Sequence, residues 1–232
     1  MGDNKNVPAY QRSYLARVPQ RYIALIADMV RSRDILPSRR RRLQADFANL
    51  VDTLNRDYQK AIAAKFVITL GDEFQGLLKS ASLIPDLMWR FEREFPERRL
   101  RVGLGFGTLD TPIQKVAINV DGPTLRLART AIELAKKTRA TGGVFCGFGD
   151  WDESFNGIAQ LLSFHRLRWT ESQRTIADLL RQGMSQVQVA RKLRIRPQVV
   201  SRQMLAAGWI PYAGGENAWR MILQKQVDPL LI

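Results

Sequence analysis

One apolar run near the start of the chain limits its possible folds more than any other feature. Residues 22–27 are Tyr-Ile-Ala-Leu-Ile-Ala, without a polar break, and Asp28 follows directly. An unbroken apolar segment of this length is typical of a strand buried on both faces, whereas a half-exposed strand alternates apolar and polar residues. We therefore expect an inner strand of a covered sheet here, with the Asp28 carboxylate at its end.

The segments that follow alternate between helical and strand patterns as far as about residue 150. Helices are predicted over residues 37–63, 84–95 and 123–137, and strands over residues 65–70, 73–78, 100–107 and 143–146. The strand at 100–107 carries three glycines on one face, so another element is expected to pack closely there. This order predicts an α+β sandwich with a mixed sheet.

The last third of the chain has a different pattern, which is helical throughout. Residues 154–169 are expected to form a connecting helix. Capping-box residues at 170–173 and 185–188 predict two further helix starts, and Pro197 predicts a third. We therefore expect a domain at residues 20–153, an all-α helix-turn-helix domain at residues 170–232, and a flexible basic arm at residues 1–19.

The composition excludes some classes of protein and favours a polyanion as partner. A single Cys and a single His rule out a disulfide scaffold or a four-ligand zinc site within one chain. No apolar run approaches the roughly 18 to 20 residues of a membrane span, so we expect a cytoplasmic protein with no membrane contact. The 36 Lys and Arg outnumber the 22 Asp and Glu, and half of the net charge of +14 lies from Arg166 onward.

The cationic residues of the C-terminal part gather around the predicted turn. Residues 191–202 hold five cations and no acid. A recognition helix starting near Pro197 would present Arg and Gln side chains suited to bidentate bonds with guanine and adenine, while the other residues would hold phosphates. The alternative is a helical bundle or dimerisation unit with a basic exterior. The predicted DNA-binding residues are Arg191, Lys192, Arg194, Arg196, Gln198, Ser201 and Arg202.

Two acids at strand ends suggest a metal site in the first domain. Asp28 ends the first predicted strand, and Asp72 lies in the predicted hairpin turn with Glu73 beside it. If the strands are neighbours, the Asp28 and Asp72 carboxylates would meet at one rim of the sheet, where like charges repel unless a cation intervenes. Mg²⁺ favours such oxygen ligands together with substrate phosphates. The alternative is that both are ordinary turn and cap residues.

The same two segments carry a family resemblance. Residues 23–33 and 66–78 resemble the two signatures of the SatD family, in which an N-terminal domain precedes a helix-turn-helix. They are similar, more distantly, to class III nucleotide cyclases and to the GGDEF domains of diguanylate cyclases. The resemblance implies a palm, nucleotide-cyclase-like (ferredoxin-like) fold, with Mg²⁺ or Mn²⁺ at Asp28 and Asp72 and a nucleoside triphosphate as ligand or substrate.

The resemblance also implies which residues would contact the nucleotide. They are Met29, Val30, Arg31, Ser32, Lys65, Arg126 and Arg129. The match has three departures, one of which is Leu70-Gly71 in the hairpin where the diguanylate cyclases have two glycines. Arg31 replaces the glycine of the phosphate loop, and Arg126 stands where the cyclases have asparagine, so the two helix arginines would either grip a triphosphate or be surface charges. We therefore assign no catalytic residue.

These features together predict a nucleotide-responsive DNA-binding regulator that acts as a homodimer. Its partners would be DNA and a nucleotide bound with Mg²⁺. One alternative is an active nucleotidyl cyclase or nucleotide-oligomerising enzyme, tethered to nucleic acid by its basic tail. Another is a protein-interaction adaptor that binds no nucleotide.

Overall fold

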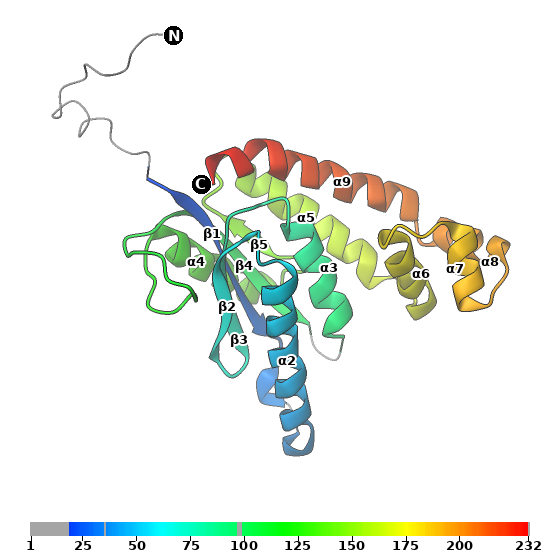
Figure 1. Ribbon diagram of the computed structural model, residues 1–232, viewed down its shortest axis with the longest axis horizontal. Coiled ribbons are helices and arrows are strands. Elements are labelled where there is room, and N and C mark those ends of the chain that lie inside the picture. The colour runs from blue at the N-terminus through cyan, green and yellow to red at the C-terminus, as the bar shows by residue number, and fades with distance from the viewer. Residues whose placement is uncertain (1–18, 35, 97–98, 232) are drawn as a thin grey trace, which may run out of the picture.

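The first part of the protein is built on one mixed sheet. The computed structural model describes residues 19–34, 36–96 and 99–231, so the predicted arm lies outside the described residues apart from Pro19. Within them, five strands form one sheet in the order β2-β3-β1-β4-β5 (Figure 1). Neighbouring strands are antiparallel except β4 and β5, which confirms the α+β class and the mixed sheet. The strands are β1 (Arg21–Met29), β2 (Ile62–Leu70), β3 (Glu73–Leu78), β4 (Leu100–Thr108) and β5 (Val144–Cys146).

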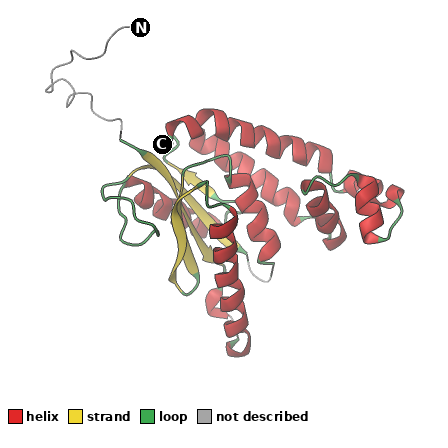
Figure 2. Cartoon of the chain, viewed as in Figure 1, coloured by secondary structure: helices red, strands yellow, loops and turns green. Residues whose placement is uncertain are grey.

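Strand β1 is the inner strand that its apolar run predicts. It pairs with β3 on one side and β4 on the other, and its residues 22–29 are all buried. Because side chains alternate between faces, Ile23 and Leu25 join one core and Ala24 and Ile26 join another. The first core lies under α2 (Pro37–Asp57) and α3 (Ile84–Glu94), and the second lies under α4 (Pro123–Thr138), so helices cover both faces (Figure 2).

Helix α4 approaches the sheet closely because the facing residues of β4 are glycines. A Cβ atom at Gly105 would lie 2.2 Å from both the Ala128 nitrogen and the Thr124 oxygen. The buried Thr124 hydroxyl lies 2.8 Å from the Gly105 carbonyl and accepts a bond from the Ala24 N–H at 3.3 Å. These contacts fix the start of α4 against β1 and β4, as the glycine pattern predicts.

The C-terminal helices extend away from the sheet and then return to it. Helix α5 (Trp151–Leu167) leads away from the sheet, and α9 (Trp209–Gln226) returns toward the sheet in contact with α5. Three short helices lie at the far end of this pair (Figure 1). The three are α6 (Glu171–Arg181), α7 (Gln186–Leu193) and α8 (Pro197–Ala206). A bridge between Arg21 and Leu231 joins the end of this return to the start of β1. Among the described residues, no helix combines the length and apolar character that crossing a membrane requires.

Several predicted helix starts are confirmed. Thr170 and Ser185 each form a complete capping box, and α8 begins at Pro197 as expected. The helix predicted to reach Ala63 ends at Asp57 instead, because the chain turns there and Ile62 begins β2. The connecting helix begins earlier than predicted, at Trp151.

Helix α9 is an element that the sequence pattern did not separate from the preceding unit. Its aromatic residues Tyr212 and Trp219 are 3% and 1% exposed. They are therefore core residues, and their rings are not available to stack on bases. The hydrophobic core continues from the sheet through α5 into α6–α9.

The close approach of α4 makes Gly105 a sharp test of the fold. We expect Gly105→Ala to lower the free energy of unfolding by roughly 1 to 3 kcal/mol or more, since the new methyl group meets backbone atoms that cannot rotate away. Urea unfolding followed by circular dichroism measures this change. The matched control is Gly157→Ala in α5, where a Cβ meets nothing within 4 Å and alanine should stabilise the helix by about 0.5 to 1 kcal/mol. Equal stability of the two variants would contradict the packing.

Candidate functional site

Asp28 lies at the end of β1 on the face that α4 covers. Asp28 is 8% exposed to solvent. Arg101, its partner on β4, donates to both carboxylate oxygens at 3.1 and 3.3 Å, and the Lys136 ammonium of α4 lies 3.3 Å away. Burial raises the pKa of the Asp28 carboxyl above its ordinary value, and the Arg101 and Lys136 charges oppose that rise. Asp28 is therefore a buried carboxyl with two cationic partners.

The acid that the sheet register puts beside Asp28 is Glu73. The two are paired residues of β1 and β3, and Glu73 is 4% exposed. Arg129 of α4 binds both Glu73 oxygens at 2.6 and 2.9 Å, and the Thr69 hydroxyl donates at 3.1 Å. That bond to Glu73 raises the pKa of Arg129. The negative charge of Glu73 also raises the pKa of Asp28. We call the group Asp28, Glu73, Arg101, Arg129 and Lys136 the acid cluster.

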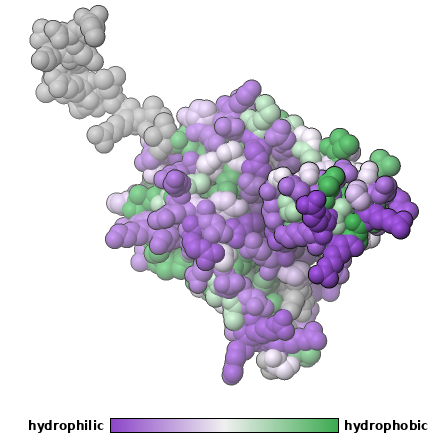
Figure 3. Space-filling model, turned by 45° about the vertical axis from the view of Figure 1, so that its right-hand side comes forward, coloured by the Kyte–Doolittle hydropathy of each residue, from purple (hydrophilic) through white to green (hydrophobic). Residues whose placement is uncertain are grey.

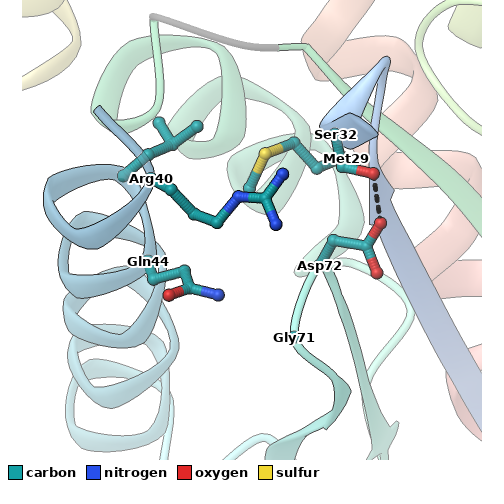
Figure 4. A pocket seen from close by; sticks show the side chains of 7 residues that line it. Met29, Ser32, Arg40, Gln44, Gly71 and Asp72 are labelled. Atoms are coloured by element: carbon teal, nitrogen blue, oxygen red, sulfur yellow. Dashed lines mark hydrogen bonds between the residues drawn. The ribbon is translucent and has the colours of Figure 1, made fainter. Parts of the chain in front are cut away.

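Asp72 lines a different site from the acid cluster, a pocket between α2, the end of β1 and the turn between β2 and β3. Its carboxylate accepts a bond from the Ser32 hydroxyl, and its carbonyl accepts from the Met29 N–H at 2.9 Å (Figure 4). Arg40 and Gln44 project from α2 toward it. The pocket has a volume of about 200 Å³ and is lined by Met29, Ser32, Arg40, Leu43, Gln44, Gly71 and Asp72.

The two predicted metal ligands thus have neighbouring backbones but separate side-chain partners. Asp28 contacts the α4 side, and Asp72 contacts Ser32 in the pocket. Over the described ranges, no cluster of three or more His, Cys, Asp or Glu side chains is arranged to hold a metal ion. Two buried carboxylates on one face still offer the oxygen ligands that Mg²⁺ prefers, with waters and phosphates completing the shell.

The residues predicted to contact a nucleotide do not gather in one place. Met29 and Ser32 line the pocket, and Arg129 belongs to the acid cluster. Arg126 binds the exposed Asp110 and Asp121 beyond the cluster. Lys65 is exposed on β2 and lines a second hollow, next to Lys115.

The loop after β1 contains a residue in a conformation that favours glycine. Arg31 adopts a φ of 56°, in the left-handed region, at the position where the resemblance to the cyclases implies a glycine. Val30 anchors the loop through an N–H bond to the Arg99 carbonyl at 2.9 Å. An exposed arginine therefore sits at the tip of this loop.

Sequence reasoning missed Glu73, Arg101 and Lys136 as members of the cluster. The position of Glu73 beside Asp72 was visible in the sequence, but its pairing with Asp28 follows from the antiparallel register of β1 and β3. Arg101 and Lys136 could not be found without the register of β4 and the position of α4, both of which depend on tertiary contacts.

The basic unit at the far end of the molecule consists of α7, α8 and the turn between them. All seven predicted DNA-binding residues are exposed. Val200 and Ala190 are buried between the helices, and Arg194 takes a left-handed conformation with φ of 55° that ends α7. Arg194 thus occupies a left-handed helix-end position at which glycine is common. The polar residues of α8 are exposed to solvent.

An ionic network joins the C-terminal helices to α3. Asp86 of α3 accepts bonds from Arg181 of α6 at 2.6 Å and from Arg220 of α9 at 2.8 Å. Arg166 of α5, 5% exposed, binds both oxygens of Glu92 at 2.7 and 2.8 Å. These charge-assisted pairs fix α5, α6 and α9 on a helix that packs against the sheet.

Comparison with known proteins gives one positive result. A protein-family model described as the SatD family matches residues 22–214. That range includes the acid cluster, the pocket and the basic unit. Neither the curated proteins nor the solved structures contain a significant match.

The raised pKa of Asp28 predicts how its contribution to stability depends on pH. A carboxyl whose pKa is higher in the folded state destabilises folding once it ionises, so its contribution falls as the pH rises from the unfolded-state pKa through the folded-state one. In EDTA we expect Asp28→Asn, which cannot ionise, to gain stability relative to the original protein as the pH rises above about 4, the ordinary pKa of an Asp carboxyl.

Urea unfolding midpoints at several pH values measure this difference. The control is Asp52→Asn, an exposed carboxyl of α2, which should give a difference that changes little with pH. A gain for Asp28→Asn that is constant or shrinks toward neutral pH would contradict the dominance of burial.

Proposed function

Because the chain belongs to the SatD family, we propose that it is a nucleotide-responsive DNA-binding regulator. In this proposal α7 and α8 form a helix-turn-helix that contacts DNA. The sheet domain, with a palm-like fold, binds a nucleotide together with Mg²⁺ or Mn²⁺. The ligand acts by favouring one arrangement of the DNA-binding units in a homodimer over another.

The observation that carries the proposal is the charge of the α7–α8 surface. No acid occurs between Asp178 and Glu216, and the exposed cations of this segment make no ion pair with any described residue. Unpaired arginines gathered on one compact helical unit suit a phosphate backbone. Arg196, Gln198 and Arg202 are exposed at the start and middle of α8, where a recognition helix contacts bases.

The sheet order supports the palm-like part of the proposal. The elements β1-α2-β2-β3-α3-β4, with β1 between β3 and β4, follow the ferredoxin-like split βαβ arrangement. The rim of such a sheet holds Asp28 and Glu73 on one face and Asp72 in the adjoining turn.

The acid cluster supports a site for a metal–phosphate ligand. Its two acids are neutralised by arginine and lysine side chains, two of them from α4. A divalent cation bound to Asp28 and Glu73 would take over this role and release Arg129 and Lys136 to bind phosphate oxygens. Such an exchange would change how α4 is held, which gives the ligand a way to affect the rest of the chain.

The network at α3 supports communication between the two ends. Asp86 and Glu92 belong to a helix that packs on the sheet, and their partners belong to the helices that carry the basic unit. A shift of α3 relative to the sheet would therefore move α6 and α9 with it.

The DNA-binding part is tested by single substitutions in α8. A target is first selected from random duplexes with the purified protein. We then expect Arg202→Ala to weaken target binding by about 1 to 3 kcal/mol and to relax specificity at one position, because a base contact is lost. Fluorescence anisotropy measures both effects. Lys225→Ala, which removes an exposed cation from α9, should leave binding unchanged. Absence of any salt-sensitive DNA binding by the original protein would reject the proposal.

The nucleotide-binding part is tested by thermal unfolding with each nucleoside triphosphate, in Mg²⁺, in Mn²⁺ and in EDTA. One nucleotide should raise the melting temperature only with the metal, since a ligand at about 100 times its Kd stabilises by about 2.7 kcal/mol. Asp28→Asn with Glu73→Gln should abolish the rise, and Asp52→Asn should keep it. Release of pyrophosphate that depends on Asp28 would instead favour an active nucleotidyl transferase, and no shift with any nucleotide would favour the adaptor.

A further inference from the structure

We infer that the first two turns of α2 are a second nucleic-acid contact, one that goes beyond the DNA contact proposed for α7 and α8. The four consecutive arginines Arg39 to Arg42 lie there, far from the basic C-terminal unit in the sequence. None of them contributes to the core. We call residues 39–42 the arginine tip, and its partner would be the sugar–phosphate backbone of a duplex.

All four arginines of the tip are exposed. Successive helical residues are about 100° apart, so four in a row surround the helix. A helix packed along its side would bury one of them, as α2 does farther on at Leu43 and Phe47, which are 3% and 0% exposed. The arginines at the beginning of α2 therefore face solvent, with Arg40 also lining the pocket. Helix α2 extends beyond the strands in Figure 1, and much of this end of the molecule is hydrophilic in Figure 3, with some apolar surface beside it.

The tip is built against the electrostatics of a helix. The N-terminal end of a helix carries partial positive charge and is stabilised by acids, not by cations. Helices α3, α5 and α6 have an acid in the first turn, whereas α4, α7, α8 and α9 have none. Helix α2 also lacks an acid and a side-chain cap there, and in addition it carries four consecutive arginines from Arg39 to Arg42. A solvated helix gains nothing from this arrangement, whereas a bound polyanion would relieve the repulsion.

The four arginines differ in whether their side chains have contacts within the protein. Arg40 lines the pocket with Asp72, and Arg42 lies 3.8 Å from Asp46. Arg39 and Arg41 form no ion pair with any described residue, although Asp34 precedes them in a short 3-10 turn. These two side chains are available to an external anion without breaking any contact described above.

The distribution of the charges favours a groove over a flat surface. A helix lying on an anionic plane needs cations on one face, at intervals of three and four residues. A helix end that enters the groove of a duplex meets phosphates on both walls, and cations all round it then find partners. The major groove of DNA is wide enough for an α-helix. The tip thus fits a duplex, with contacts to phosphates and not to bases.

The test compares two double variants that remove the same charge. Arg39→Gln with Arg41→Gln alters the tip and spares the pocket. Lys60→Gln with Lys79→Gln removes two exposed lysines elsewhere on the surface. Anisotropy with a duplex of arbitrary sequence is measured over a range of salt concentrations. Each lost phosphate contact lowers the slope of log K against log salt by about 0.9, so we expect the tip variant to lose about 2 and the control to lose less than 1.

Stability separates a binding role from a structural one. Because the arginines oppose the helix dipole, the tip variant should unfold at the same temperature as the original protein or at a higher one. A lower melting temperature, or a salt slope equal to that of the control, would overturn the inference.

The tip and the proposed recognition helix are distinguished by repeating the titration with Arg196→Ala and Arg202→Ala combined. If only this variant lowers the slope, the tip inference is wrong and the proposed function stands. If only the tip variant does so, the inference stands and the DNA-binding role of α8 is wrong. Loss in both, adding up in the quadruple variant, is the expected result, and no binding by the original protein would overturn both.

Discussion

The close contact between α4 and the glycine face of β4 is the constraint on which the rest of the site depends. A side chain at Gly103 or Gly105 would meet the backbone of α4, so only glycine allows the helix to lie so near. Thr124 then fixes the start of the helix through bonds to two strands. Because α4 lies this close to the sheet, Arg129 reaches Glu73 and Lys136 reaches Asp28. The acid cluster is thus a product of backbone packing.

The charges of the acid cluster and those of the basic surfaces on α7, α8 and the arginine tip are neutralised in different ways. In the acid cluster, buried carboxylates and cations of the same chain neutralise one another. On α7, α8 and the arginine tip, cations face solvent with few acids near them. The first arrangement can exchange an internal partner for a metal ion or a phosphate. The cations of α7 and α8, with Arg39 and Arg41 of the tip, form no ion pair with a described residue, so they remain long-range attractors of polyanions.

Local signals in the sequence were enough for most elements and for few of the contacts between them. Proline and capping residues marked the starts of α2, α6, α7 and α8, because those signals act within one turn. The end of α2 was misjudged by six residues, since no glycine follows Asp57 and the apolar pattern continues into β2. Helix α9 escaped notice because its buried residues face α3 and α5, which are distant in sequence.

The candidate site was predictable only in outline. Asp28 and the hairpin acids follow from strand ends, and the exposure of the basic residues follows from their pattern on α7 and α8. Which hairpin acid stands beside Asp28 depends on strand register, and Glu73 rather than Asp72 has that position. The roles of Arg101 and Lys136 depend on elements brought together from more than 70 residues away, as the separation of 73 between Arg101 and Asp28 illustrates.

The way the chain leaves the body along α5 and comes back along α9 has a consequence for how the basic unit can move. Helices α6 to α8 are held at both ends, by two long antiparallel helices that contact each other. A unit with two attachments cannot swing freely as one on a single linker does. Its position is set by the rotation and sliding of that helix pair and by the bond of Arg181 on α6 to Asp86 on α3. Another three-helix module in this place would therefore need to keep the contact with α3 as well as the two helix junctions.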